Sequence, residues 1–215
     1  SVHITAEETY HCKQNTFAFG ACFAEVEVDI PLGKVQVLHI VNVHDSGVLI
    51  NPKLAEAQVH GGMSMGLGYA LSEQLLFDQN ARPLNGNFLD YKLPTALDTP
   101  ELQAQFVQTW DPTGPYGNKA LGEPPAIPPA PAIRNAVLHA TGVAVNSLPL
   151  NPQKLVEQFM AAGLISEGGP SMYDLERIYR AKGVADAIAA LERDPRAVVI
   201  CGGSDVLIRI REGKL

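Results

Sequence analysis

The chain has 215 residues, of which 46% are hydrophobic and 18% are charged, a composition typical of a globular protein with a buried core. Its net charge of −7 excludes the basic surface that nucleic-acid binding requires. No apolar run reaches the roughly 18 residues of a membrane helix, and residues 1–10 lack the basic start and apolar centre of a secretion signal. Cys12, Cys22 and Cys201 are too widely spaced for a zinc or iron–sulfur motif, and their odd number favours a reducing compartment, so we expect a cytoplasmic protein.

The first predicted elements form a β-hairpin. Residues 22–30 alternate apolar and acidic side chains with a period of two, which predicts a half-buried strand. A turn over 31–34 leads into a second β-rich run at 35–43. Residues 44–52 are rich in turn formers and are expected to form a loop.

Residues 52–77 favour a helix but contain four closely spaced glycines, Gly61, Gly62, Gly66 and Gly68. Glycines at this density cost too much for a plain helix, so we expect an interrupted element. They make sense where the backbone comes close to a neighbouring helix or a ligand. For Gly66 and Gly68 both explanations stay open.

The segment NKALGEPP, residues 118–125, places Glu123 between Gly122 and two prolines. The prolines remove two backbone donors and fix two φ angles, and the first disfavours the α region for Glu123. We therefore expect a stiff, non-repeating backbone around this acid. A solvated acid in a surface turn is the plainer alternative.

Two further helices follow that segment. Residues 130–142 carry apolar side chains at helical spacing and end at Gly142. Residues 151–163 begin with Asn151 as the N-cap and Pro152 at the first helical position.

The C-terminal part has a different character. Residues 165–171 are expected to form a linker. Beyond it, 184–194 predicts a helix, and 196–210 predicts a buried β run broken by a Gly-Gly turn. This order is typical of the start of an α/β unit.

Four other polar residues are expected to have structural roles. His44 and Asp45 are neighbours at a strand end and point in opposite directions, so they are not expected to share a metal ion. A turn role suits Asp45. Tyr116 and Lys119 are expected to support the loop, and Lys119 adds a nearby positive charge.

Residues 41–74 and 116–136 closely resemble the C-terminal part of the molybdenum subunit of bacterial xanthine dehydrogenases, in the xanthine oxidase family. The similarity covers about residues 15–164. It implies a molybdenum–molybdopterin cofactor and oxidation of hypoxanthine- or xanthine-type purines. In that mechanism a metal-bound hydroxide attacks a ring carbon, hydride passes to a molybdenum sulfide, and electrons travel through iron–sulfur clusters to FAD.

The resemblance also implies individual roles. Glu123 aligns with the catalytic glutamate, which takes the proton from the metal-bound hydroxide. Gln58 aligns with a pterin-contacting glutamine, and the remaining expected molybdopterin contacts are Gly61, Gly62 and Gly122. Where relatives usually carry Glu, this chain has His60, for which a hydrogen-bonded structural role and a pterin contact both stay open.

Residues 172–210 resemble the start of the FAD-binding subunit of the same enzymes. The implied FAD pyrophosphate loop consists of Ile200, Cys201, Gly202, Gly203, Ser204 and Asp205. The N–H groups of successive glycines suit an anion, although a Gly-Gly-Ser-Asp sequence such as residues 202–205 also occurs as an ordinary tight turn.

We therefore expect an α+β fold with residues 1–164 as the C-terminal portion of a molybdopterin-binding domain, a linker at 165–171, and an incomplete α/β FAD-binding segment at 172–215. The implied partners are the rest of the molybdenum subunit, the FAD subunit and the iron–sulfur subunit. Alone, the chain is expected to be inactive. The alternatives are a non-catalytic assembly module, or the same chemistry on another N-heterocycle or an aldehyde.

Overall fold

The computed structural model describes residues 3–9, 11, 14–165 and 182–193. The chain divides into two compact units, Ser1–Phe159 and Met160–Leu215. In the second unit, helix α4 (Val184–Arg193) confirms the helix expected there. Most of the expected linker and the whole β run at 196–210 lie outside the described residues.

The sheet of the first unit begins with the expected hairpin. Strand β1 (Phe19–Asp29) pairs antiparallel with β2 (Lys34–Asp45), with a bulge between Glu25 and Val26. Strand β3 (Glu101–Phe106) pairs in parallel with β2 and completes the order β1-β2-β3. The sequence did not predict β3, because glutamate and glutamine supply three of its six side chains and carry little β-propensity.

Helix α1 (Pro52–Leu71) connects β2 to β3 and runs without a break through all four glycines. The expectation of an interrupted element was therefore wrong. Its N-terminus is capped by Asn51, whose Oδ1 accepts from Leu54 N at 3.2 Å. The cost of the glycines is offset by close packing, because Gly62 lies against Pro125 and Gly66 lies against Pro129.

The next two helices along the chain are as expected. Helix α2 (Pro129–Thr141) ends at Gly142, which adopts the left-handed conformation with a φ of 75°. Helix α3 (Pro152–Ala161) is capped by Asn151, whose Oδ1 accepts from Lys154 N at 2.9 Å.

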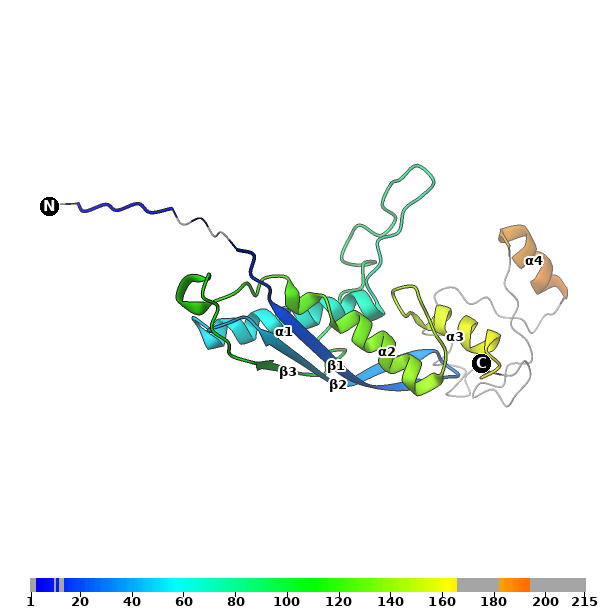
Figure 1. The fold of residues 1–215 in the computed structure, drawn as a ribbon. Coiled ribbons are helices and arrows are strands. Elements are labelled where there is room, and N and C mark those ends of the chain that lie inside the picture. The colour runs from blue at the N-terminus through cyan, green and yellow to red at the C-terminus, as the bar shows by residue number, and fades with distance from the viewer. Residues whose placement is uncertain (1–2, 10, 12–13, 166–181, 194–215) are drawn as a thin grey trace. The chain divides into compact units, whose positions relative to one another are not determined.

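The first unit is a mixed α/β fold in which helices pack along the sheet (Figure 1). Helix α2 contacts β1, α1 contacts β3, and the two helices contact each other. Fully buried side chains come from every layer: Ile40, Val59, Met63, Leu67, Ile133, Val137, Leu155 and Phe159. Between α1 and β3 a long loop of residues 72–100 projects away from the sheet (Figure 1). Within the described ranges, no helix is long and apolar enough to cross a bilayer.

Candidate active site

Glu123 lies at the start of a short 3₁₀ helix, η2 (Pro124–Ala126), which the two prolines begin. Its φ of −89° and ψ of −27° fall in the α region, so the expected exclusion of that region was wrong. The steric preference before proline is outweighed by the turn, because Ala126 N donates to Glu123 O at 2.9 Å. A stiff backbone at Glu123 stays a prediction, because the two prolines fix two φ angles beside it.

Two side-chain amides hold the backbone of residues 122–125, which we call the Glu123 segment. Gln58 Nε2, on α1, donates to Gly122 O at 2.6 Å. Asn42 Nδ2, on β2, donates to Pro125 O at 3.0 Å in a buried position. The Glu123 side chain is exposed and forms no hydrogen bond or ion pair with any residue that the structure describes. A free carboxylate thus stands on anchored backbone.

The glycines predicted to meet a cofactor lie in two different environments. A Cβ on Gly62 would fall 2.5 Å from Pro125 Cβ, so packing against η2 already fills this position. Gly61 and Gly122 are exposed, and a Cβ on either would meet nothing within 4 Å. Open backbone therefore lies on both sides of the Gln58–Gly122 hydrogen bond.

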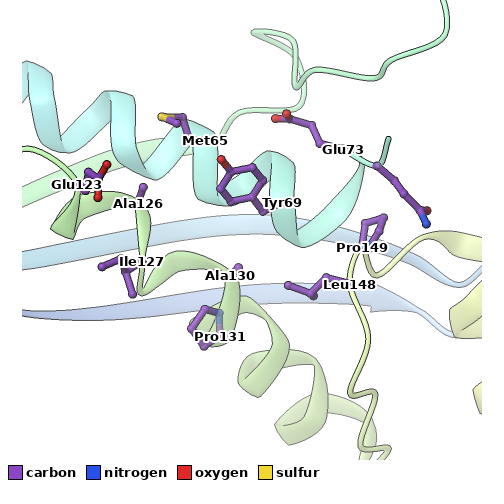
Figure 2. A pocket seen from close by; sticks show the side chains of 11 residues that line it. Met65, Tyr69, Glu73, Glu123, Ala126, Ile127, Ala130, Pro131, Leu148 and Pro149 are labelled. Carbon is purple, nitrogen blue, oxygen red and sulfur yellow. The ribbon is translucent and has the colours of Figure 1, made fainter. Parts of the chain in front are cut away.

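A hollow of about 680 Å³ adjoins Glu123 between α1 and the segment formed by η2 and α2. Figure 2 shows Glu123 at one end and Glu73 toward the other, with Met65 and Tyr69 projecting from α1. Glu73 accepts from the Tyr91 hydroxyl at 2.9 Å. The other lining residues are Gln74 and six apolar residues: Ala126, Ile127, Ala130, Pro131, Leu148 and Pro149.

The chain entering the Glu123 segment is tied to the end of β2 by a nearly buried ion pair. Lys119 Nζ lies 2.7 Å from Asp45 Oδ2, and Asp45 Oδ1 accepts from Thr109 Oγ1 and from Gly47 N. Burial raises the pKa of the Asp45 carboxyl, but the hydrogen bonds from Lys119, Thr109 and Gly47 prevail and hold it below its ordinary value. Asp45 thus joins the expected turn role to an ion pair that the sequence did not predict.

The helix-facing side of β2 carries an unusual run of buried polar residues. Asn42 and His44 alternate along the strand, Ser46 follows directly after it, and each is at most 1% exposed. Asn42 Oδ1, Ser46 Oγ and His60 Nε2 have no hydrogen-bond partner among the described residues. The structural interpretation of His60 therefore lacks its expected hydrogen bond at Nε2. Burial also lowers the pKa of the His44 imidazole.

The structure brings together Glu123, Gly122, Gln58 and Gly62, and it leaves Gly61 open on the same helix. The FAD-loop residues, Ile200, Cys201, Gly202, Gly203, Ser204 and Asp205, lie outside the described residues. In the part of the chain that is described, no group of three His, Cys, Asp or Glu side chains could hold a metal ion.

Asn42 is the residue of this site that sequence reasoning missed. A signal was present. Asn42 interrupts the apolar run at 35–43, and the residues two positions away on either side, Ile40 and His44, are buried. Buried amides are kept where they have a specific hydrogen-bond partner.

Comparisons with known proteins show what this chain is similar to. Residues 1–100 match the family model described as a molybdopterin cofactor-binding domain. The xanthine dehydrogenase molybdenum-binding subunit of Escherichia coli O157:H7 is 53% identical over 163 residues, covering 75% of this chain and 22% of the relative. The nicotine 6-hydroxylase large subunit of Paenarthrobacter nicotinovorans is 34% identical over 182 residues, covering 83% of this chain and 21% of the relative.

Among solved structures, a Cu,Mo-CO dehydrogenase superposes with a TM-score of 0.67 at 29% identity, covering 72% of this chain and 20% of that one. The chain thus spans about a fifth of the length of the relatives it matches. Residues 1–100 match the molybdopterin cofactor-binding domain, and over about three quarters of its length the chain is similar to molybdenum subunits of the xanthine oxidase family.

Proposed function

We propose that this chain supplies the general base of a molybdenum hydroxylase that oxidises purines of the hypoxanthine and xanthine type, and that Glu123 is this base. The observation that carries the proposal is an exposed carboxylate that has no partner among the residues the structure describes, on backbone held from both sides. A general base needs a carboxylate that is free to accept a proton and fixed in place. An acid in an ordinary solvated turn has no need of two anchoring amides.

The residues present fit one edge of a molybdopterin site. Gly61 and Gly122 leave open backbone where a bulky cofactor could approach, and Gln58 lies between them. The fit is poor at Gly62, whose open side is filled by Pro125. When bound, the cofactor would supply the two-electron chemistry and the oxygen delivered to the substrate. Glu123 Oε1 or Oε2 would take up the proton released in that reaction.

A purine substrate is supported by the 53% identity to a xanthine dehydrogenase subunit. Another N-heterocycle is the second candidate, supported by the similarity to the nicotine 6-hydroxylase subunit, which extends over 83% of this chain. Turnover of the assembled enzyme with hypoxanthine, xanthine and nicotine would separate the two.

We further propose that residues 172–215 begin an FAD-binding segment, with residues 200–205 as its pyrophosphate loop. On this proposal FAD and iron–sulfur partners receive the electrons from the molybdenum centre. The free thiol of Cys22, whose pKa burial raises to about 11, suits a reducing cytoplasm.

The test replaces Glu123 by glutamine in the assembled enzyme, which keeps the shape and removes the base. We expect turnover to fall by about 10²- to 10⁴-fold, the usual contribution of a general base. The matched control is Glu27→Gln, an exposed carboxylate on β1, which should keep turnover within about twofold. Normal turnover in a Glu123→Gln enzyme with full molybdenum content would show that Glu123 is not the base.

A further inference from the structure

Three backbone carbonyl oxygens of the Glu123 segment accept hydrogen bonds. Gly122 O accepts from Gln58, Glu123 O accepts from the amide of Ala126, and Pro125 O accepts from Asn42. The first and last of these contacts join residues 64 and 83 positions apart in the chain. The segment is therefore pinned to α1 on one side and to β2 on the other.

Burying the Asn42 side chain costs folding free energy. Its side chain is fully buried, and its Oδ1 has no partner among the described residues. An unpaired buried carbonyl is costly, so a valine or leucine would suit this inward strand position better on packing grounds alone. What the amide provides is one donor, aimed at Pro125 O. Pro124 and Pro125 have no backbone N–H to donate, so this stretch of backbone offers its carbonyl oxygens for hydrogen bonding.

Gln58 supplies the other contact from a different environment. It is exposed on α1, one turn before Gly62, and Gly62 packs directly on Pro125. The α1 backbone and the Glu123 segment thus lie in contact, and the amide of Gln58 spans the remaining gap to Gly122.

We propose that Asn42 and Gln58 are positioning residues that together fix the Glu123 segment, and so set the place from which the Glu123 carboxylate accepts its proton. The proposal rests on Glu123 acting as the base. Asn42 touches neither substrate nor cofactor in this scheme and acts only through the backbone. For Gln58, this role is additional to any contact with the pterin.

A double-mutant cycle in the assembled enzyme tests the coupling. Misplacement of a catalytic group by about 1 Å can cost about 10²-fold in rate, so Asn42→Ala should lower kcat about 10- to 100-fold and change KM much less. In a Glu123→Gln background the same change should lower kcat less than about threefold, because the group it positions is gone. Equal losses in both backgrounds would overturn the proposal.

The exposed partner provides a second variant that does not disturb the core. Gln58→Glu keeps the shape but places a carboxylate oxygen against Gly122 O, and with molybdenum content matched to the parent it should lower kcat less in the Glu123→Gln background than in the parent. The control is Ser46→Ala, which removes a buried hydroxyl just after β2 that forms no hydrogen bond with any described residue. Ser46→Ala should keep kcat within about twofold.

Hydrogen exchange on the 215-residue chain gives a readout that is independent of activity. Asn42→Ala and Gln58→Glu should each speed exchange at the amide of Ala126 by about tenfold, while amides in the middle of α2 keep their rates. Ser46→Ala should leave both unchanged. If exchange at Ala126 stays at the parent rate in both variants, Asn42 and Gln58 do not fix the Glu123 segment, whatever the role of Glu123. Active Glu123→Gln enzyme with faster exchange in the variants would instead refute only the proposed base.

Discussion

At the scale of single residues, the charged groups of the candidate site differ in whether they have a partner. Asp45 and Lys119 form their ion pair at the end of β2, and the Lys119 side chain is 7% exposed. Lys119 Nζ also lies 5.4 Å from the centre of the Phe19 ring. Among the described residues, the Glu123 side chain, four positions further along the chain, has no hydrogen-bond or ion-pair partner. Lys119 itself is already paired with Asp45.

The Asp45 pair predicts a specific pH dependence of stability. Because hydrogen bonds lower the pKa of Asp45 in the folded state, its contribution is complete above the unfolded pKa of about 3.9. That contribution is lost as pH falls through the folded pKa. Asp45→Asn should cost about 1–3 kcal/mol of unfolding free energy between pH 5 and 8, since it leaves Lys119 buried without its counter-ion.

Urea unfolding of both proteins from pH 8 down to pH 3 measures this. The difference in unfolding free energy should stay constant above pH 5 and shrink below about pH 4. A difference that is the same at pH 3 and pH 7 would mean that the ion pair does not contribute. Glu27→Gln, on an exposed carboxylate of β1, should stay within about 0.5 kcal/mol of the parent.

At the scale of elements, α1 and η2 pack so closely that the Glu123 segment is part of a helix interface. Gly62 and Gly66 are spaced one turn apart, and both lie against prolines of the opposing segment. Gly61 is adjacent in sequence but faces open space. The glycine cluster therefore serves packing on one side of α1 and leaves exposed backbone on another.

Alanine at Gly61 and at Gly62 should have opposite effects. Both changes gain up to about 1 kcal/mol of helix propensity. Only Gly62→Ala places a methyl group against Pro125, and we expect a net loss of about 1–3 kcal/mol there. Thermal or urea unfolding should rank Gly61→Ala above the parent and Gly62→Ala below it. Equal gains at both positions would contradict the close approach of α1 to η2.

The same elements show what local sequence can and cannot predict. The hairpin, α2 and α3 followed from alternation, helical spacing and caps such as Asn151, which are properties of a few neighbouring residues. Strand β3 and the unbroken α1 did not, because β3 depends on the free edge of β2, and α1 on contacts with residues about 60 positions away. The α conformation of Glu123 was missed because the η2 turn outweighs the ordinary preference before proline.

The candidate site divides in the same way. The proline context and the family resemblance identified Glu123 as the candidate catalytic residue. The role of Asn42 depends on a hydrogen bond across 83 residues, which no local pattern reveals.

At the scale of the whole molecule, much apolar surface is exposed. The loop of residues 72–100 presents large hydrophobic side chains to solvent, among them Phe88, Leu89 and Leu97, each at least 80% exposed. Phe19 and Phe23 on β1 are each 64% exposed. Apolar surface on this scale is typical of protein interfaces, and the relatives are about five times as long as the matched part of this chain.

The isolated 215-residue chain should therefore lack a complete site. We expect it to bind molybdenum well below one atom per chain and to show no purine-dependent dye reduction, because Gln58, Gly61 and Gly122 would form only one edge of the proposed cofactor site. Metal analysis and a dye-reduction assay on the purified chain measure this. Stoichiometric molybdenum together with turnover would contradict the expectation.

The central claim is that Glu123 is the base, and the most direct measurement is single-turnover reduction of the molybdenum-loaded assembled enzyme by purine. With molybdenum content matched to the parent, Glu123→Gln should slow the reductive step by about 10²-fold or more and leave substrate binding nearly unchanged. A reductive rate within about threefold of the parent would contradict the account.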